Sequence, residues 1–391
     1  MNLARFSQPW DCDFPVPIRY GPGRLAEVGA LCKARGLRNP LIVTDRASAG
    51  LAFVDRTRGF LAEAGLACGV FSDVSPNPTD AEVARGSAAF SAGGHDGVIA
   101  LGGGSGMDAG KAISLVARRD RPLWDFDFDK VPPDGLAAAD FPPLMCIPTT
   151  AGTGAETEST GMITDTARAI KGCIWHPAQK PFAALLDPEV TLSLPPGLTA
   201  WTGCDALVHA IEAYCVPSLH PICDGIALQA LGLIHRALPA VLDRPASVEA
   251  RGAMLVGSCL AGVAFLKGLG LVHAISHMVG AEFDTHHGLT NAVLLPPVLR
   301  FNEAAIADKV APMCAAMGLD GRDFPAFLGA VNAVLDRCDI PRDLAALGVT
   351  SDATARLAAK AHRDPARTTN PRPASVDDIA ALIQVALIST R

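Results

Sequence analysis

The residues of this chain best suited to chemistry are an aspartate and five histidines in its second half. Asp205 and His209 are four residues apart, as are His273 and His277, and His286–His287 follow shortly after. On a helix, side chains four residues apart project from the same face. Imidazole and carboxylate groups together suit Fe(II) or Zn(II), which accept mixed nitrogen and oxygen ligands. The spacing therefore predicts a divalent-metal site, although any one of these histidines taken alone would be better explained as a core residue.

A glycine-rich turn in the first half suggests a phosphate-binding loop. The stretch Leu101–Lys111 (LGGGSGMDAGK) follows an apolar strand and begins a helical pattern. Glycines let the backbone approach a phosphate, and free N–H groups at a helix start can bind it. The spacing does not fit a Walker A loop, but Gly104, Gly106 and Ala109 fit the looser dinucleotide-binding pattern. The residues alone leave open an ordinary strand-to-helix turn.

Two further segments fit a dinucleotide. The small and hydroxyl residues of Pro148–Glu156 (PTTAGTGAE) follow another apolar strand and suit a diphosphate or an amide. Asp45 ends an early strand, where a carboxylate could accept a hydrogen bond from a ribose hydroxyl. A turn or helix cap is an equal alternative for Asp45.

The elements that must position these residues divide the chain in two. Short apolar runs alternate with helical patterns in the first half, which is typical of β-α-β units and a parallel sheet. We predict strands at 41–45, 68–71, 97–101, 144–147 and 182–187, helices at 24–35 and 80–92, and a hairpin of 157–164 with 170–175. After Asp187 the pattern is almost entirely helical. We therefore expect an α/β Rossmann-like domain at 1–187, an all-helical metal-binding domain at 188–391, and a cleft between them.

Composition excludes several classes of protein. The 391 residues are 49% hydrophobic and 19% charged, which argues against disorder, and the net charge is −7, which argues against nucleic acid or an anionic membrane as partner. Eleven scattered cysteines fit reduced thiols in a cytoplasmic protein better than a disulfide framework. The apolar stretch 253–275 fits a buried helix and turn better than a membrane span.

Over almost its whole length the chain resembles the iron-containing (group III) alcohol dehydrogenase family, which shares its architecture with dehydroquinate synthase. The motifs that carry the resemblance are Gly102-Gly103-Gly104-Ser105 with Asp108 and Lys111, Pro148-Thr149-Thr150-Ala151-Gly152-Thr153-Gly154, Asp205-Ala206-Leu207 with His209-Ala210-Ile211-Glu212-Ala213, and Gly270-Leu271-Val272-His273 continuing to His277 and to His287-Gly288 with Asn291-Ala292.

The resemblance assigns roles by position. It implies that a divalent metal, Fe(II) by preference or Zn(II), is bound by Asp205, His209, His273 and His287, and that His277 is the catalytic histidine near the nicotinamide. It leaves His286 without a role. The positions that it implies for contact with NAD are Asp45, Asn77, Gly102, Gly103, Gly104, Ser105, Thr149, Thr150, Thr153 and Lys171.

The activity that the resemblance implies is hydride transfer between NAD(H) and a small metal-bound alcohol or aldehyde, in a homodimer. A metal- and NAD-dependent lyase or sugar-phosphate dehydrogenase of the dehydroquinate synthase-like fold is the alternative. One segment departs from the family: Ala264–Gly270 carries Lys267 where many members have an asparagine. A lysine is costly to bury alone. It could pair with a carboxylate, or it could bind an acidic group on the substrate.

Overall fold

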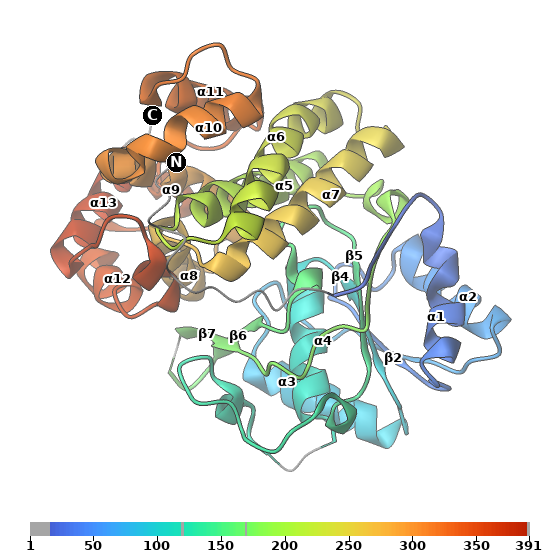
Figure 1. Ribbon diagram of the computed structural model, residues 1–391. Helices are drawn as coiled ribbons and strands as arrows, with labels where there is room; N and C mark the ends of the chain where they lie inside the picture. The colour runs from blue at the N-terminus through green and yellow to red at the C-terminus, as the bar shows by residue number, and fades with distance from the viewer. Residues whose placement is uncertain (1–15, 119–120, 169, 389–391) are drawn as a thin grey trace. The chain divides into compact units, whose positions relative to one another are not determined.

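The computed structural model describes residues 16–118, 121–168 and 170–388, and these fall into two units (Figure 1). Residues 16–150 and 155–194 form the first, here called the α/β unit. Residues 151–154 and 195–388 form the second, the helical unit. The short helix η6 (Pro188–Thr191) belongs to the α/β unit, although the sequence-based boundary lies before it.

A six-stranded parallel sheet is the centre of the α/β unit, with the strand order β1-β8-β5-β4-β2-β3. In that order the strands are Ile18–Tyr20, Ala183–Leu186, Leu144–Pro148, Val98–Gly102, Leu41–Val43 and Gly69–Phe71. A separate antiparallel hairpin pairs β6 (Gly161–Asp165) with β7 (Ile170–Ile174). The predicted hairpin and five of these strands are confirmed. The short edge strand β1 was missed, because its three residues are all exposed and carry no buried pattern.

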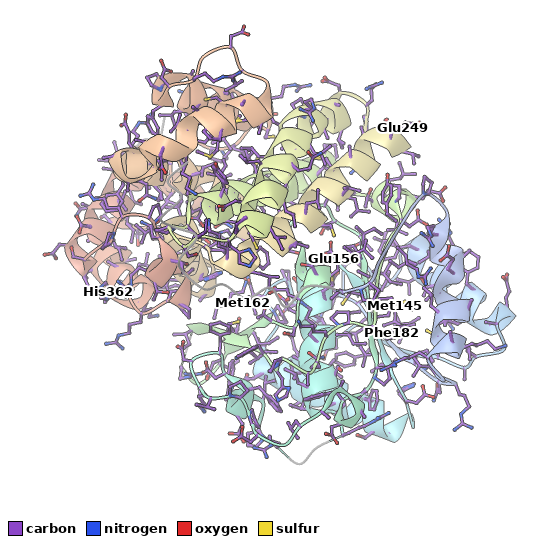
Figure 2. All side chains as sticks on the ribbon, viewed as in Figure 1. Met145, Glu156, Met162, Phe182, Glu249 and His362 are labelled. Carbon is purple, nitrogen blue, oxygen red and sulfur yellow. The ribbon has the colours of Figure 1, made fainter. Side chains whose placement is uncertain are left out.

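Successive side chains along each strand point to opposite faces of the sheet, and each face is covered by a layer of helices. Ile42 and Ile99 pack on one face, and Val43 and Ala100 on the other. The first face is covered by α1 (Val28–Ala34) and α2 (Ala52–Glu63), and the second by α3 (Asp80–Ala92) and α4 (Gly104–Val116). Met145 on β5 lies in the packed interior of this unit (Figure 2).

The helical unit is built around α5 (Pro196–Cys215), which is buried on almost every face. A proline at its first turn costs no hydrogen bond, because that N–H has no partner within the helix. The other α-helices are α6 (Pro221–Asp243), α7 (Val248–Ala264), α8 (Leu271–Phe283), α9 (His287–Asn302), α10 (Ala307–Met317), α11 (Phe324–Arg337), α12 (Thr354–Ala361) and α13 (Val376–Ile388). The predicted fold class, a Rossmann-like α/β part and an all-helical part, is confirmed.

Short 3-10 helices join these elements. They are η2 (Arg24–Glu27), η3 (Leu123–Phe126), η4 (Ala138–Asp140), η5 (Ala155–Thr157), η6, η7 (Phe265–Lys267), η8 (Glu303–Ile306), η9 (Ala345–Leu347), η10 (Ser351–Ala353) and η11 (Pro365–Thr369). Phe265 of η7 lies against His209, and Asp364, which precedes η11, contacts His277.

Two helical stretches are long and apolar enough to cross a membrane, Pro221–Asp243 and Val248–Lys267. Their most apolar windows are 44% and 67% buried within the protein, and a core helix of a soluble protein passes the same test. The stretch 253–275 comprises the end of α7, the turn η7 and the start of α8, as a buried helix and turn would require. No disulfide joins any cysteines among the described residues.

Candidate metal centre and cofactor edge

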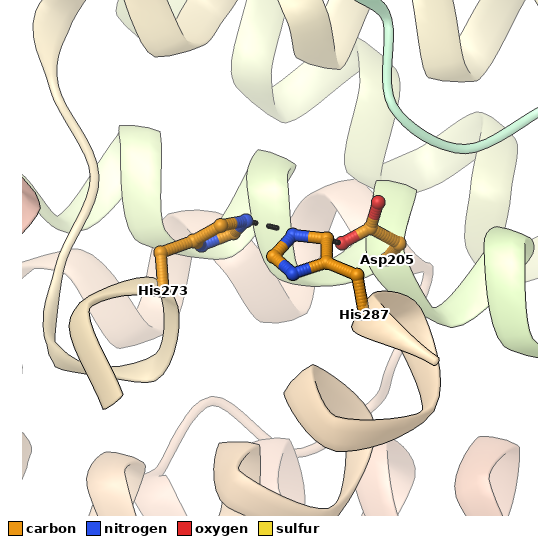
Figure 3. A group of neighbouring side chains, drawn as sticks. All are labelled: Asp205, His273 and His287. Carbon is orange, nitrogen blue, oxygen red and sulfur yellow. Dashed lines mark ion pairs between the residues drawn. The ribbon is translucent and has the colours of Figure 1, made fainter. Parts of the chain in front are cut away.

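Three helices bring three predicted ligands together, Asp205, His273 and His287, and the fourth, His209, lies beside Asp205. Asp205 and His209 lie on α5, His273 lies in the first turn of α8, and His287 is the first residue of α9. Oδ1 of Asp205 is 4.0 Å from Nε2 of His209, 3.8 Å from that of His273 and 3.7 Å from that of His287. Figure 3 shows His273 and His287 directed at the carboxylate. The ligand atoms of Asp205, His273 and His287 all lie within 4.8 Å of one another, close enough to share one ion.

The protonation of these groups follows from their burial. Asp205, His209 and His273 are buried, whereas the His287 side chain keeps 24% of its surface exposed. Burial lowers the pKa of His209 to about 4, so this imidazole is neutral at pH 7. Burial also lowers the pKa of His273, but the hydrogen bond and charge of Glu212 outweigh it and the pKa is raised. Neutral imidazoles are the metal-binding form, and His287 lies on the open side of the group.

The side chain of Asn291 tests whether a cation fits. Its Nδ2 lies 2.7 Å from Oδ1 of Asp205, 3.2 Å from Nε2 of His273 and 3.0 Å from Nε2 of His287. One N–H donor group thus faces three atoms that can each offer a lone pair. Its own Oδ1 is buried and has no hydrogen-bond partner among the described residues. An electron-poor group belongs at this point, and a divalent cation is the strongest such group, so the donor set fits the metal.

His277 stands beside this group and is held by another carboxylate. Its ring stacks on that of His287 with centroids 5.4 Å apart, and its Nδ1 lies 2.8 Å from Oδ2 of Asp364. Asp364 is the N-cap of η11, where its Oδ1 accepts from the Ala366 N–H. Sequence reasoning missed Asp364, because an aspartate before a proline signals only a helix start.

Two other residues are explained by the helix ends. Nδ1 of His286 accepts from the Leu289 N–H at 3.4 Å and so caps α9, while its ring lies against Trp201. His286, to which the resemblance assigned no role, therefore has a structural role as a helix cap. Glu212, on α5 beyond His209, accepts from Nδ1 of His273 at 2.7 Å. Glu212 comes seven residues after Asp205 and therefore lies on the face of α5 that carries the candidate ligands. This spacing in the sequence could have identified Glu212 as a residue of the site.

Of the two alternatives for Lys267, the structure shows the ion pair. Its Nζ forms a 2.5 Å hydrogen bond with Oδ1 of Asp224, and its side chain is only 1% exposed. Lys309 lies 3.9 Å from the other oxygen of that carboxylate. A buried ammonium needs a counter-charge, and Asp224 supplies it. The alternative stated above, an ion pair with a carboxylate, is the one observed.

The predicted cofactor residues of the α/β unit gather where adjacent parallel strands end. Asp45 follows β2, Gly102–Ser105 follow β4, and Thr149 and Thr150 follow β5. Because β4 lies between β2 and β5, these three turns are neighbours at the carboxyl edge of the sheet. Nucleotides bind at this edge in open α/β sheets. The glycine turn thus follows the fourth strand in the chain, not the third, because β1 was missed.

The glycine turn has the form of a phosphate cradle. A Cβ at Gly103 would lie 3.2 Å from Cγ2 of Thr150, and one at Gly102 would lie 3.4 Å from Cα of Gly106. Helix α4 starts at Gly104 with a cap residue that has no side chain, so its first N–H groups are available to a ligand. The turn therefore fits the diphosphate of a dinucleotide.

The other cofactor candidates divide between the units. Nζ of Lys171, on β7, donates to Oδ1 of Asn77 at 3.3 Å, and Oγ of Ser105 donates to the Pro76 carbonyl, so these three residues gather in the α/β unit. Asp45 accepts from the N–H and Oγ of Ser48 at 2.9 and 2.7 Å. Thr153 belongs to the helical unit.

Comparison with known proteins agrees with this architecture. A family model described as "Iron-containing alcohol dehydrogenase" matches residues 15–188, and one described as "Fe-containing alcohol dehydrogenase family, C-terminal" matches residues 199–387. The chain is 37% identical over 382 residues to the NAD-dependent methanol dehydrogenase of Bacillus methanolicus, covering 95% of this chain and 98% of that protein.

Two further relatives extend the comparison. The 4-hydroxybutyrate dehydrogenase of Cupriavidus necator is 37% identical over 380 residues, covering 93% of this chain and 96% of that protein. A crystal structure of a 1,3-propanediol oxidoreductase matches with a TM-score of 0.91 at 33% identity, covering 97% of this chain and all of that one. The chain therefore belongs to the iron-containing alcohol dehydrogenase family and is an oxidoreductase of that family.

Proposed function

We propose that this protein interconverts a small primary or secondary alcohol and its carbonyl compound with NAD(H). In this proposal a divalent metal, Fe(II) by preference, is bound by Asp205, His209, His273 and His287. The observation that carries the proposal is that three imidazoles from three helices lie within 4.0 Å of one oxygen of Asp205.

The chain's own residues divide the work of such a reaction. A bound divalent ion supplies Lewis acidity toward the substrate oxygen. Asp205 contributes the only anionic donor of the four and offsets part of the ion's charge. Because Nδ1 of His277 donates to Asp364, its Nε2 is left as an acceptor. His277 is thus suited to take the alcohol proton and to pass it to solvent.

In this proposal NAD(H) binds at the carboxyl edge of the sheet. The N–H groups at the start of α4 would hold the diphosphate, and Thr149 and Thr150 add hydroxyl groups beside it. Asp45 would accept from a ribose 2′-hydroxyl and repel a 2′-phosphate, which favours NAD over NADP. Asn77 and Lys171, already joined by a hydrogen bond, would face the ribose.

For the substrate we propose a small alcohol or aldehyde. The related proteins act, by their names, on substrates as different as methanol and 4-hydroxybutyrate. The lyase or sugar-phosphate alternative is not favoured, because it needs cationic side chains for a phosphate and Lys267 is already paired with Asp224. We further propose a cytoplasmic homodimer.

The test combines metal content with turnover. Metal-loaded protein should form NADH with a panel of small alcohols, and His209→Ala or His273→Ala should lose most of the metal and the activity, since each removes one of four bonds. His287→Ala should likewise lose metal. Its matched control is His286→Ala, which removes the neighbouring side chain that caps α9 and should keep the metal. Full metal occupancy in His209→Ala and His273→Ala would contradict the ligand assignment.

A further inference from the structure

Glu212 makes three hydrogen bonds in the interior of the helical unit. Its Oε2 accepts from Nδ1 of His273 at 2.7 Å and from the Gly270 N–H at 3.1 Å, and its Oε1 accepts from the Val272 N–H at 2.8 Å. The side chain is 7% exposed. A buried carboxylate is stable only when its oxygens are satisfied, and these three donors satisfy them.

The position of Glu212 on α5 connects it with the metal centre. Asp205, His209 and Glu212 follow one another at four and three residues, so all three project from one face of α5. Asp205 and His209 are candidate ligands, and Glu212 is hydrogen-bonded to His273, a candidate ligand on α8. One face of α5 thus carries two candidate ligands and the side chain that orients a third.

The residue before α8 is a glycine because Glu212 comes so close. A Cβ at Gly270 would lie 2.6 Å from Oε1 of Glu212 and 2.9 Å from Oδ1 of Asn370. Asn370 accepts from the Leu271 N–H at 3.1 Å. The start of α8 is therefore capped by two side chains distant in sequence, and only one of these, Glu212, also contacts a histidine ring among the contacts described.

We infer that Glu212 is a positioning residue that fixes the tautomer of His273. A carboxylate can only accept, so the hydrogen of the neutral imidazole must sit on Nδ1 for this bond to form. Nε2 then keeps its lone pair, directed toward Asp205. The inference rests on the proposed metal site and assigns Glu212 no contact with substrate or cofactor. Carboxylates that orient metal-binding histidines in this way typically contribute 10- to 100-fold in metal affinity.

Glu212→Gln weakens the hold on His273. The single amide oxygen of glutamine can face the Val272 N–H or Nδ1 of His273 but not both, and a neutral amide oxygen is a weaker acceptor than a carboxylate oxygen. We expect Glu212→Gln to weaken Zn²⁺ binding to the metal-depleted full chain about 10- to 100-fold, measured by competition with a chelator. Zn²⁺ affinity equal to that of the wild type would overturn the inference.

Asn370→Ala is the matched control. It removes the other acceptor at the start of α8 and leaves the bond between Glu212 and His273 in place. Its Zn²⁺ affinity should stay within about twofold of the wild type, because the bond that orients His273 is intact. If Asn370→Ala weakened Zn²⁺ binding as much as Glu212→Gln, the role of Glu212 would be helix capping alone.

A spectroscopic measurement keeps the inference testable if Glu212→Gln does not fold. Zn²⁺-loaded protein with ¹⁵N-labelled histidine should show slowly exchanging imidazole N–H signals, because a buried carboxylate holds the proton. One such signal should persist in Asp364→Asn, which disturbs His277, and disappear in Glu212→Gln. Absence of any signal in Asp364→Asn would overturn the inference. A wild-type protein that bound no metal would instead contradict the proposed function.

Discussion

Nδ1 of His277 lies 2.8 Å from Oδ2 of Asp364, so an imidazole and a carboxylate 87 residues apart form a buried pair beside the candidate metal ligands. Both side chains are largely buried, and the ring of His277 is stacked on that of His287. The pair holds Nε2 of His277 as an acceptor, which a proton relay requires.

The first prediction concerns this pair. His277→Ala should keep the metal and lower kcat about 10²- to 10⁴-fold, the range typical of a lost general acid–base. Asp364→Asn should lower kcat less, about 10-fold, since the imidazole is still present but less well oriented. The double variant should be no slower than His277→Ala, because Asp364 acts through His277. Loss of metal from His277→Ala, measured by elemental analysis, would make His277 a ligand.

The second prediction concerns the choice of cofactor. Asp45→Gly should narrow the preference for NAD over NADP, since it removes a carboxylate that repels the 2′-phosphate. The measurement is the ratio of kcat/KM for the two cofactors. Ser48→Ala is the control, because it removes one of the two Ser48 bonds and keeps the charge of Asp45. A wild-type enzyme that used NADP more efficiently would refute the role of Asp45.

The third prediction concerns Lys267. Lys267→Met should destabilise the fold by about 2–3 kcal/mol, less than for a fully buried pair, because Asp224 is partly exposed and Lys309 stays nearby. Urea denaturation would measure this loss. KM values for an acid-bearing alcohol and for its neutral analogue should change equally. A rise confined to the acid-bearing substrate would restore Lys267 to the substrate site.

The fourth prediction concerns Asp108 on α4. Burial raises the pKa of this carboxyl to about 6, against the lowering effect of Lys111, Lys171 and the Met162 backbone. The folded state therefore binds the proton more tightly than the unfolded state, and stability should fall as the pH rises from about 4 to 6, by about 3 kcal/mol from this group.

Asp108→Asn should remove this dependence and be more stable than the wild type at pH 7. The free energies of unfolding at about pH 3.5 and about pH 7, which lie on either side of that window, measure the dependence. Asp55→Asn, at an exposed position of α2, is the control and should leave the dependence unchanged. Parallel pH curves for the wild type and Asp108→Asn would assign the dependence to other groups.

Local patterns predicted most of the fold. The helix α3 was placed at its observed residues, where Thr79 and Glu82 form a capping box, and the paired periodicities of β6 and β7 identified the hairpin. The spacing of Asp205 with His209 predicted that both lie on one helix, and α5 carries both. Each of these signals lies within a few residues of the element it describes.

What the sequence did not reveal depends on contacts between distant segments. Glu212 meets His273 across 61 residues, and Asn370 meets Leu271 across 99. Spacing could not distinguish His286 from His287 either, because one caps α9 and the other begins it. The partner of Lys267 was undecided for the same reason, since Asp224 lies on a different helix.

The segment Ala151–Gly154 belongs to the helical unit although it lies within the sequence of the α/β unit. It packs within the helical unit, where a Cβ at Gly154 would lie 2.6 Å from Cα of Gly262 and where Nδ1 of His209 lies 3.3 Å from the Gly152 carbonyl oxygen. Yet the chain on both sides of it belongs to the α/β unit. A fragment starting at Pro195 would lack part of its own interior. In a chimaera of two such enzymes, these four residues must therefore be exchanged together with the helical half.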